Sequence, residues 1–218
     1  MVSKILKNLF CKKLNFLFYL TPMNFLAHLY LSGSHPEIKV GNFIGDFVKG
    51  RDLRDRYGAG IAKGVEMHRE IDAFTDRHPV MRQSKNRLRP KYRHYSGVIT
   101  DIFYDHFLAA NWKQYTQVPL ESFAAESYQL ILDRQPLMPE RVMQMLPYMM
   151  RGNWLVNYAK IDGIRQALLG MSRRASFDSK MDESVEDLKN YYDEFQKEFD
   201  AFFPELKKWA DEWLLINL

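Results

Sequence analysis

The sequence predicts a single-domain, all-α helical bundle, and three observations support this prediction. From residue 23 onward apolar residues recur at helical spacing almost everywhere, and strict alternation of apolar and polar residues is rare. The 218 residues are 46% hydrophobic and 14% aromatic, which is enough for one folded core. Glycine and proline divide the helical pattern into segments of ordinary helix length.

The expected helices follow from these breakers in order. Gly33 and Pro36 separate a first helix from a second, and Pro79 suits the first turn of a fourth because a first-turn N–H has no helical partner. The first three helices are expected at about 23–31, 37–49 and 58–74, and the fourth begins at Pro79. Further helices are expected at about 93–111, 119–133, 139–150, 153–171, 183–201 and 203–216. The last two are expected to be a long amphipathic helix and a shorter one, divided at Pro204.

Residues 1–22 differ from the rest of the chain because they hold four lysines and no acidic residue. A signal peptide fits poorly, since Lys12 and Lys13 interrupt the apolar run and no A-x-A site follows. A basic amphipathic helix on a membrane and an upstream start codon, with Met23 as the natural first residue, are the alternatives. No apolar run reaches the roughly 20 residues of a membrane-spanning helix. The single cysteine, Cys11, excludes an internal disulfide and indicates a reducing, cytoplasmic compartment.

The charge of the chain is informative only by its distribution. The formal charge is +4, from 31 basic and 27 acidic residues, and the four lysines of residues 1–22 account for the whole excess. The remaining domain is neutral but concentrates six cations and no anion in residues 82–93. Such a run is usually a solvated helix face, and it is also the best candidate for contact with an acidic partner.

Two ionisable residues continue an apolar stripe in the third helix. Ile61, Val65, His68 and Asp72 follow one another at steps of four, three and four, which is one helical face. An unpaired buried carboxylate costs several kcal/mol, so this pair is expected to be hydrogen-bonded together or bound to a cation. The pair alone does not decide between these alternatives.

The segment GVITDIFYDHFLAA repeats this anomaly. Asp101 and Asp105 share one face with Val98, and His106 lies on the neighbouring apolar face. A salt bridge to an arginine would explain any single one of them. Because two helices share the feature, a metal centre built from several helices is favoured. Aspartate and histidine without thiolate indicate Mn²⁺, Mg²⁺ or Fe²⁺ rather than zinc, and such a site suits phosphoester hydrolysis.

Two further residues could contribute ligands. His28 lies on a nearly all-apolar helix, where a lone histidine is more often a hydrogen-bonded core residue. Asp46 shares its helical face with polar residues, so spacing alone indicates a solvated acid. Gly41 and Gly45, four residues apart, allow another helix or a ligand to approach the backbone closely.

Six motifs carry a resemblance to a known family. They are MNFLAHLYL at 23, GNFIGDFVKG at 41, GIAKGVEMHREIDAFTDRHP at 60, DIFYDHFLA at 101, NWLVNY at 153 and GMSRRA at 170. Together they resemble the acyl carrier protein phosphodiesterases, also called acyl carrier protein hydrolyases, from residue 23 to about Arg174. The resemblance implies an all-helical fold distantly like the HD-type metal-dependent phosphohydrolases. It also implies Mn²⁺-dependent hydrolysis, a reaction of lipid metabolism that yields apo acyl carrier protein and 4'-phosphopantetheine.

The resemblance also implies roles for individual residues. Asp46 of the GD motif is implied to be a catalytic or metal-binding acid, against the prediction from spacing. The HD signature is a His-Asp dipeptide, whereas this chain has Asp105-His106 in reversed order. The expected catalytic core is Asp46, His68, Asp72 and Asp105, with His28 and Asp101 as further metal ligands and His106 as a proton donor. Attack on phosphorus by a metal-activated water is the implied mechanism.

The implied partner is acyl carrier protein, a small and strongly acidic protein, which calls for a positive surface near the site. The candidate substrate-binding cations are Arg87, Arg89 and Arg93 in the basic run, the pair Arg173-Arg174, and Lys49 and Arg69 near the expected ligands. Two other functions stay open. One is an HD-like phosphohydrolase acting on a nucleotide or another small phosphoester. The other is a nucleic-acid-binding module that uses residues 82–93, which leaves the buried histidines and aspartates unexplained.

Overall fold

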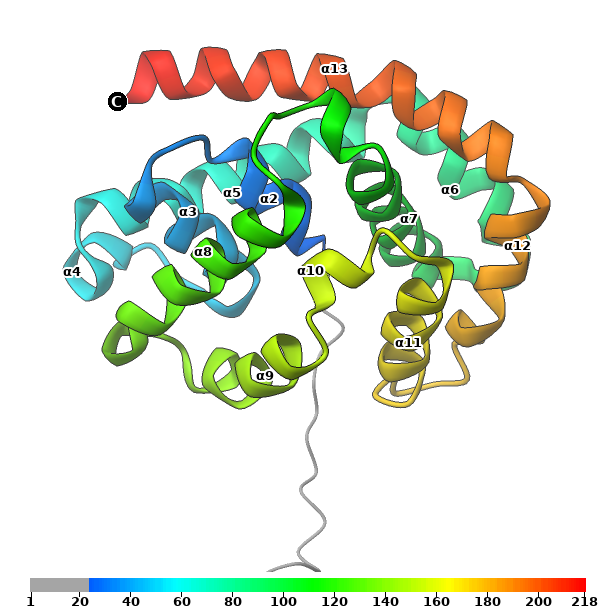
Figure 1. The fold of residues 1–218 in the computed structure, drawn as a ribbon, viewed down its shortest axis with the longest axis horizontal. Helices are drawn as coiled ribbons and strands as arrows, with labels where there is room; N and C mark the ends of the chain where they lie inside the picture. Colours follow the sequence, from blue (N-terminus) through cyan, green and yellow to red (C-terminus); the bar gives the residue numbers. More distant parts are fainter. Residues whose placement is uncertain (1–23) are drawn as a thin grey trace, which may run out of the picture.

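The computed structural model describes residues 24–218, and the regular structure within them is entirely helical (Figure 1). This confirms the predicted all-α class. The expected likeness to the HD-type phosphohydrolases stays a prediction. The expectations for residues 1–22, including Cys11, lie outside the described residues. Among the described residues, no helix combines the length and the apolar character needed to cross a membrane.

The N-terminal half of the fold contains the first three expected helices and one that was not expected. Its elements are α2 (Phe25–Leu31), α3 (Pro36–Ile44), the 3₁₀ turn η1 (Gly45–Phe47), α4 (Leu53–Tyr57) and α5 (Ala59–Arg77). The second helix was expected to continue to residue 49. It instead ends at Ile44 and tightens into η1, so the residues after it no longer keep α-helical spacing.

Helices α3 and α5 cross at very short range, and the glycine pair of α3 explains how. A Cβ added to Gly41 would lie 2.1 Å from the carbonyl oxygen of Ile61 on α5, so only glycine permits this crossing. A Cβ on Gly45 would lie 2.2 Å from Cγ of His68, so the imidazole ring rests directly on the backbone there. The close approach expected from this spacing is confirmed, and it brings η1 against the functional face of α5.

The middle of the chain supplies the central helix and the lower part of the molecule. The elements are α6 (Pro79–Tyr92), η2 (Arg93–Tyr95), α7 (Ser96–Ala110), η3 (Trp112–Gln114), α8 (Leu120–Asp133), η4 (Gln135–Leu137), α9 (Glu140–Arg151), α10 (Trp154–Asn157) and α11 (Ile161–Ser172). One helix was expected over 153–171. The structure divides it into α10 and α11 because Lys160 has an extended backbone, with φ −117° and ψ 137°.

The two C-terminal helices follow η5 (Met181–Glu183) and occur in the opposite order of length from the prediction. The short helix is α12 (Ser184–Asn190), and the long one is α13 (Tyr192–Asn217). The predicted break at Pro204 was wrong, because α13 continues through it (Figure 1). Pro204 is exposed, while Phe203 and Leu206 beside it are buried, so packing of the apolar face offsets the roughly 3 kcal/mol that an interior proline costs.

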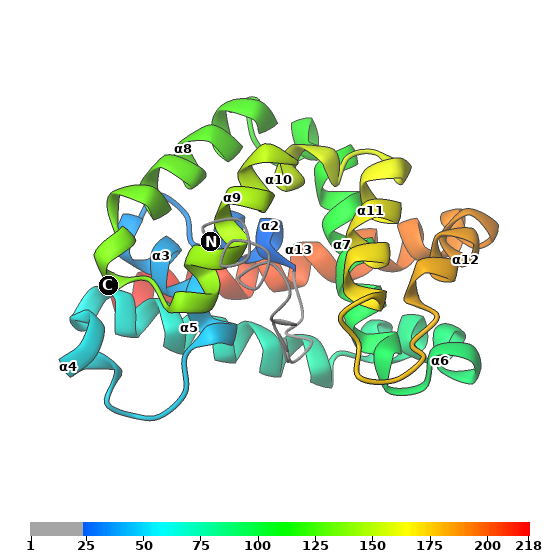
Figure 2. The ribbon, with the colours of Figure 1, turned by 90° about the horizontal axis from the view of Figure 1, so that it is seen from below.

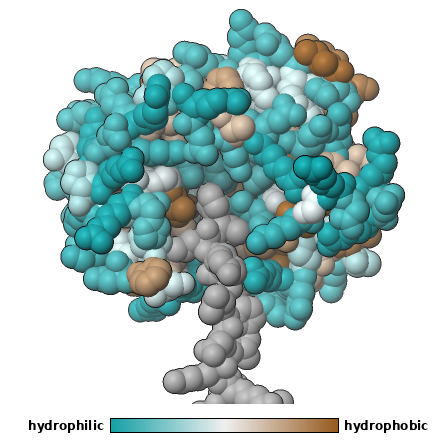
Figure 3. All heavy atoms as spheres, turned by 180° about the vertical axis from the view of Figure 1, so that it is seen from behind, coloured by the Kyte–Doolittle hydropathy of each residue, from teal (hydrophilic) through white to brown (hydrophobic). Residues whose placement is uncertain are grey.

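The core surrounds α7, whose Phe103 and Phe107 are fully buried. Figure 2 shows α7 beside α11, with α13 running across the back of the bundle. Seen from behind, the surface is mostly hydrophilic apart from small apolar patches, one of them at the end where α13 terminates (Figure 3). The exposed apolar side chains of that terminus include Leu215 and Ile216. The functional face lies instead where α2, η1 and α5 meet.

Candidate metal centre

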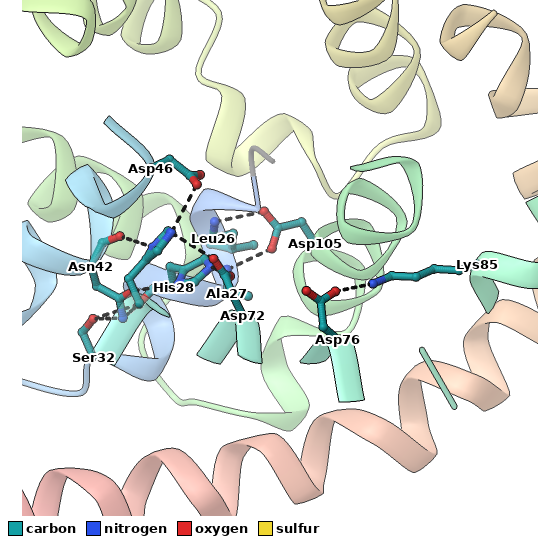
Figure 4. A network of polar contacts seen from close by, with 11 residues as sticks. Leu26, Ala27, His28, Ser32, Asn42, Asp46, Asp72, Asp76, Lys85 and Asp105 are labelled. Atoms are coloured by element: carbon teal, nitrogen blue, oxygen red, sulfur yellow. Dashed lines mark hydrogen bonds and ion pairs between the residues drawn. The ribbon is translucent and has the colours of Figure 1, made fainter. Parts of the chain in front are cut away.

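Four side chains from three elements converge at one point. His28 comes from α2, Asp46 from η1, and His68 and Asp72 from successive turns of α5. Figure 4 labels His28, Asp46 and Asp72 of this group. The Nε2 atoms of His28 and His68 each lie 3.4 Å from a different oxygen of Asp72, and Nε2 of His68 is 3.4 Å from Oδ1 of Asp46. The imidazole rings stack with centroids 4.0 Å apart. We call these four residues the His/Asp cluster.

Asn42 fixes the orientation of both imidazoles. Its Oδ1 lies 2.6 Å from Nδ1 of His28, and its backbone oxygen lies 2.8 Å from Nδ1 of His68. Its Nδ2 donates to the carbonyl of His28 and to the hydroxyl of Ser32, each at 3.0 Å, which orients the amide. Because carbonyl oxygens only accept hydrogen bonds, each Nδ1 carries a proton and each Nε2 presents a lone pair to the cluster when the ring is neutral.

The two Nε2 atoms are the unusual feature of this arrangement. Both are buried, and neither has a hydrogen-bond partner among the described residues. The 3.4 Å separations from the carboxylates exceed the roughly 2.7–2.9 Å of a charge-assisted hydrogen bond. An unsatisfied buried polar atom costs about 1–3 kcal/mol. One ligand atom from each of His28, His68 and Asp72 lies within 4.8 Å of the other two, so a cation held among them would satisfy both lone pairs and a carboxylate. These three residues fit a divalent metal ion, and Asp46 lies beside them against His68.

The electrostatics of the cluster agree with this fit. Burial alone would lower the pKa of His28, but its contact with Asp72 and the charges of Asp72 and Asp46 raise it. Burial would likewise raise the pKa of Asp72, but the contact with His28 and the charges of His28, His68 and Lys85 lower it. Asp72 is 40% exposed whereas His28 is 2% exposed, so the cluster opens to solvent on the carboxylate side. A negative, solvent-facing edge attracts cations.

The prediction from spacing that Asp46 is an ordinary solvated acid was wrong. The side chain is only 14% exposed and lies against His68. That prediction assumed a continuous helix to residue 49, whereas η1 turns the chain after Ile44 and redirects Asp46 into the cluster. Arg69, next to His68, donates at 3.4–3.5 Å to the carbonyls of Val48 and Gly50 and thereby holds the segment that follows Asp46.

Asp105 was expected in the catalytic core, but the structure gives it a different position. Its two carboxylate oxygens accept the backbone N–H groups of Leu26 at 3.0 Å and Ala27 at 2.9 Å (Figure 4). These N–H groups open α2, where Asn24 makes no side-chain cap. Complete burial raises the pKa of Asp105 to about 8, in spite of these two bonds. Asp105 therefore anchors the helix that carries His28 and is not one of the converging groups.

Asp101 and His106, the other predicted residues of α7, also lie outside the His/Asp cluster. Burial raises the pKa of Asp101 to about 8, with Lys85 opposing and the nearby Asp72 adding to the shift. Nδ1 of His106 donates to the carbonyl of Tyr158 at 2.7 Å.

The second ring nitrogen of His106 is engaged as well. Its Nε2 then accepts from the hydroxyl of Tyr192 at 3.0 Å, and burial lowers the pKa of the ring. With both nitrogens bonded away from the cluster, the structure offers no support for His106 as a proton donor.

Half of the cations in the basic run at 82–93 are paired with acids within the fold. Three of its six cations form ion pairs with acids of other helices: Arg87 with Glu198, Lys85 with Asp76, and Lys91 with Glu183 and Asp187. Both terminal nitrogens of Arg87 bond to Glu198, at 2.6 and 2.7 Å. Arg87 thus has a structural role, which corrects its assignment to substrate binding. Arg89 and Arg93 are exposed.

The remaining predicted cations are divided between two places. Lys49 and Arg69 are exposed, and in the chain they lie three residues after Asp46 and one residue after His68. Arg173 is exposed after α11, whereas Arg174 is half-buried and lines a cavity between α10 and α11 together with Trp154.

Asn42 is the residue that sequence reasoning missed. It lies one helical turn before Asp46 and is completely buried. The available signal was a polar amide between the apolar-flanked glycines of GNFIG, on the same face as an acid. Only the fold shows that this amide contacts both histidines.

Comparisons with known proteins agree with the motifs. The family model described as acyl carrier protein phosphodiesterase matches residues 23–206. The chain is similar to the acyl carrier protein phosphodiesterase of Klebsiella pneumoniae (strain 342), at 35% identity over 87% of this chain and 98% of the relative. Proteins of the same name from Photorhabdus laumondii and Escherichia coli O6:H1 are each 33% identical, over 87% and 86% of this chain and 96% and 97% of the relative. No solved structure matches the chain significantly.

Proposed function

The chain belongs to the acyl carrier protein phosphodiesterase family, and from that premise we propose that it is a metal-dependent hydrolase of holo acyl carrier protein. The reaction would cleave the phosphodiester between 4'-phosphopantetheine and the carrier protein's serine, giving apo carrier protein and free 4'-phosphopantetheine. The observation that carries the metal dependence is a pair of buried Nε2 atoms that face two carboxylates and find no hydrogen-bond partner in the described part of the chain.

The His/Asp cluster would hold the cation through Nε2 of His28, Nε2 of His68 and the carboxylates of Asp46 and Asp72. Such a mixed nitrogen and oxygen donor set suits Mn²⁺, with Mg²⁺ or Fe²⁺ as alternatives. When bound, the ion would polarise the phosphoryl oxygens and make a water molecule more acidic.

The protein's own groups contribute orientation of the ligands and of the attacking water. Asn42 orients both rings so that their Nε2 lone pairs face the position proposed for the cation, and this arrangement exists before substrate arrives. Asp72 is the most exposed acid of the cluster, and it keeps an ionised carboxylate because its pKa is lowered. Its solvent-facing carboxylate is therefore placed to orient an attacking water through a hydrogen bond, while the lowered pKa makes it a weak proton acceptor. Arg69 holds the segment behind Asp46 and so positions that carboxylate.

The acidic carrier protein would dock on positive charge around this opening. The exposed cations nearest to the cluster in sequence are Lys49 and Arg69, and Arg89, Arg93 and Arg173 add charge elsewhere on the surface. Such contacts steer association and weaken with added salt. We place the reaction in the cytoplasm, in keeping with the single cysteine of the chain.

The proposal is tested by incubating the full-length protein with holo acyl carrier protein in Mn²⁺ or in EDTA and following the carrier protein by mass spectrometry. We expect a mass loss equal to 4'-phosphopantetheine, in Mn²⁺ only. His68→Ala and Asp46→Ala should lower the rate at least about a thousandfold, since metal assistance contributes several kcal/mol. Their helical circular dichroism should be retained.

His35→Ala is the matched control, because His35 is exposed and makes no side-chain cap at the start of α3. This variant should keep wild-type activity. Full activity of His68→Ala would contradict the assignment of the centre. Hydrolysis of small phosphoesters without release of 4'-phosphopantetheine would favour the alternative function as a small-molecule phosphohydrolase.

A further inference from the structure

A cavity of about 490 Å³ lies between α10 and α11, outside the His/Asp cluster. Its walls include Trp154 and Tyr158 on one side and Ala167, Gly170 and Arg174 on the other. Figure 1 shows α10 and α11 as neighbouring segments joined by a short connection. The volume falls within the roughly 300–1,000 Å³ of small-molecule sites.

Two sequence motifs that the metal centre does not use meet in this cavity. Trp154 and Tyr158 belong to NWLVNY, and Gly170 and Arg174 belong to GMSRRA. The other four motifs supply the His/Asp cluster and its supports. The motifs that carry the family resemblance therefore build two places in the fold, and the cavity is the second.

The shape of the cavity follows from one face of α11. Gly163, Ala167 and Gly170 follow one another on α11 at steps of four and three, Arg174 comes two residues after the helix ends, and all four line the cavity. A Cβ on Gly163 would lie 1.9 Å from the carbonyl oxygen of Asn157, so this glycine lets α11 approach the end of α10. A Cβ on Gly170 would meet its nearest heavy atom, Nη1 of Arg174, only at 3.6 Å. The missing side chain at Gly170 thus leaves room.

The chemistry of the walls favours an extended, mostly uncharged ligand. Trp154, Ala167 and the glycines provide apolar surface, and Lys160 and Asp162 add one charge of each sign. Asn157, Gln166 and Arg174 supply amide and guanidinium donors. Carbonyl and hydroxyl groups are the acceptors that such donors recognise. Pantetheine, with two amides, a hydroxyl and a dimethyl-substituted carbon, combines these properties.

The cavity and the His/Asp cluster are joined by a short series of contacts. Tyr158, in the cavity wall, accepts through its carbonyl from His106 at 2.7 Å. The neighbouring Asp105 accepts from the backbone of Ala27 at 2.9 Å, and His28 of the cluster is the next residue. A pantetheine arm has about as many chain bonds as four residues and so extends for roughly 15 Å.

We propose that the cavity between α10 and α11 binds the pantetheine arm while the phosphodiester lies at the His/Asp cluster. This assignment rests on the proposed function and adds to it the part of the protein that recognises the arm. The cavity would hold the arm before and after cleavage, because the arm belongs both to the bound carrier protein and to the released 4'-phosphopantetheine.

The test fills the cavity and measures recognition of the arm. Ala167→Leu adds bulk inside the cavity, and Ala125→Leu makes the same change on the exposed surface of α8 as the matched control. For Ala167→Leu we expect the KM for holo acyl carrier protein to rise roughly tenfold or more, as when a pocket rejects a group of a few methylenes. The ratio of kcat/KM for holo carrier protein to that for bis(p-nitrophenyl) phosphate should fall similarly, and Ala125→Leu should keep the wild-type ratio.

A direct binding measurement separates this proposal from the proposed function. Free pantetheine, which lacks the phosphate, is titrated calorimetrically into the wild-type protein and both variants. Binding that Ala167→Leu abolishes and Ala125→Leu preserves supports the cavity, even if holo carrier protein is not cleaved. Wild-type binding and KM in both Ala167→Leu and Gly170→Leu would overturn it. If Ala167→Leu does not fold, as judged by circular dichroism, Gly170→Leu provides the decision.

Discussion

Helices α5 and α7 carry the same anomaly in sequence, ionisable residues on otherwise apolar faces, yet the fold uses them in opposite ways. On α5, His68 and Asp72 face an opening in which two imidazole nitrogens have no hydrogen-bond partner within residues 24–218. On α7, Asp105 accepts two backbone N–H groups, and both nitrogens of His106 are bonded. The first set has binding capacity left over, whereas the second is satisfied by the protein itself.

The difference teaches that burial of a polar group does not reveal its role. Asp105 is completely buried, more so than Asp72, and it anchors α2. A binding site is distinguished by the number of buried donors and acceptors that are not already hydrogen-bonded within the protein. On α5 that remainder is created by Asn42, which occupies the Nδ1 atoms and leaves the Nε2 atoms to a ligand.

The largest effect is expected from removing Asp105, because the backbone N–H groups that begin α2 depend on it. Asp105→Ala leaves the N–H groups of Leu26 and Ala27 without their acceptor, so we expect a loss of about 2–4 kcal/mol in the free energy of unfolding. Urea denaturation followed by circular dichroism measures this. Asp101→Ala is the matched control, since Asp101 accepts no hydrogen bond within the described residues and lies one turn earlier on α7. Equal losses in the two variants would contradict the anchoring role of Asp105.

Removing Asn42 should affect the site on α5 by lowering its affinity for metal. Asn42→Ala deprives Nδ1 of His28 of its acceptor while the backbone oxygen at position 42 still serves His68. Loss of such a support typically lowers metal affinity about 10–100-fold, and we expect that range for Mn²⁺. Calorimetric titration of Mn²⁺ measures it.

Ser32→Ala provides the graded control for Asn42. It removes one of the two acceptors that orient the Asn42 amide, so its effect on Mn²⁺ affinity should be smaller. An Asn42→Ala protein with wild-type Mn²⁺ affinity would show that the histidines do not depend on this amide, and the proposed origin of the free Nε2 atoms would fail.

The sequence predicted those features that depend on local spacing. His68 and Asp72 are four residues apart on a continuous helix, so their common face followed directly. The pair Gly41 and Gly45 likewise indicated a close approach, and in the structure α5 packs directly against both glycines. The resemblance to the family then supplied Asp46, which spacing had placed in solvent.

Features that depend on distant partners were not predictable from spacing. Asp105 accepts hydrogen bonds from Ala27 and Leu26, which lie 78 and 79 positions earlier in the chain. No local pattern distinguishes an acid that caps such a remote helix from a metal ligand. The ion pair between Arg87 and Glu198 spans 111 residues, so the basic run appeared unopposed in sequence. Pro204 failed as a breaker because the burial of Phe203 and Leu206 outweighs a local preference.

A smaller effect is expected on α7, where the hydrogen-bonded His106 should make the free energy of unfolding depend on pH. Burial holds the pKa of His106 below its ordinary value of 6.5, so the unfolded chain takes up this proton before the folded protein does. The stability that neutral His106 contributes is therefore fully present above pH 6.5 and is lost as the pH falls through the lowered folded-state pKa.

In His106→Asn this loss is absent, so the stability difference between wild type and variant should narrow from pH 7.5 to pH 5. Urea denaturation of both proteins across that range measures the difference, in which the titrations of all other groups largely cancel. A difference that stays constant or widens toward pH 5 would mean that His106 is charged in the folded protein, and α7 would then hold a group available for proton transfer after all.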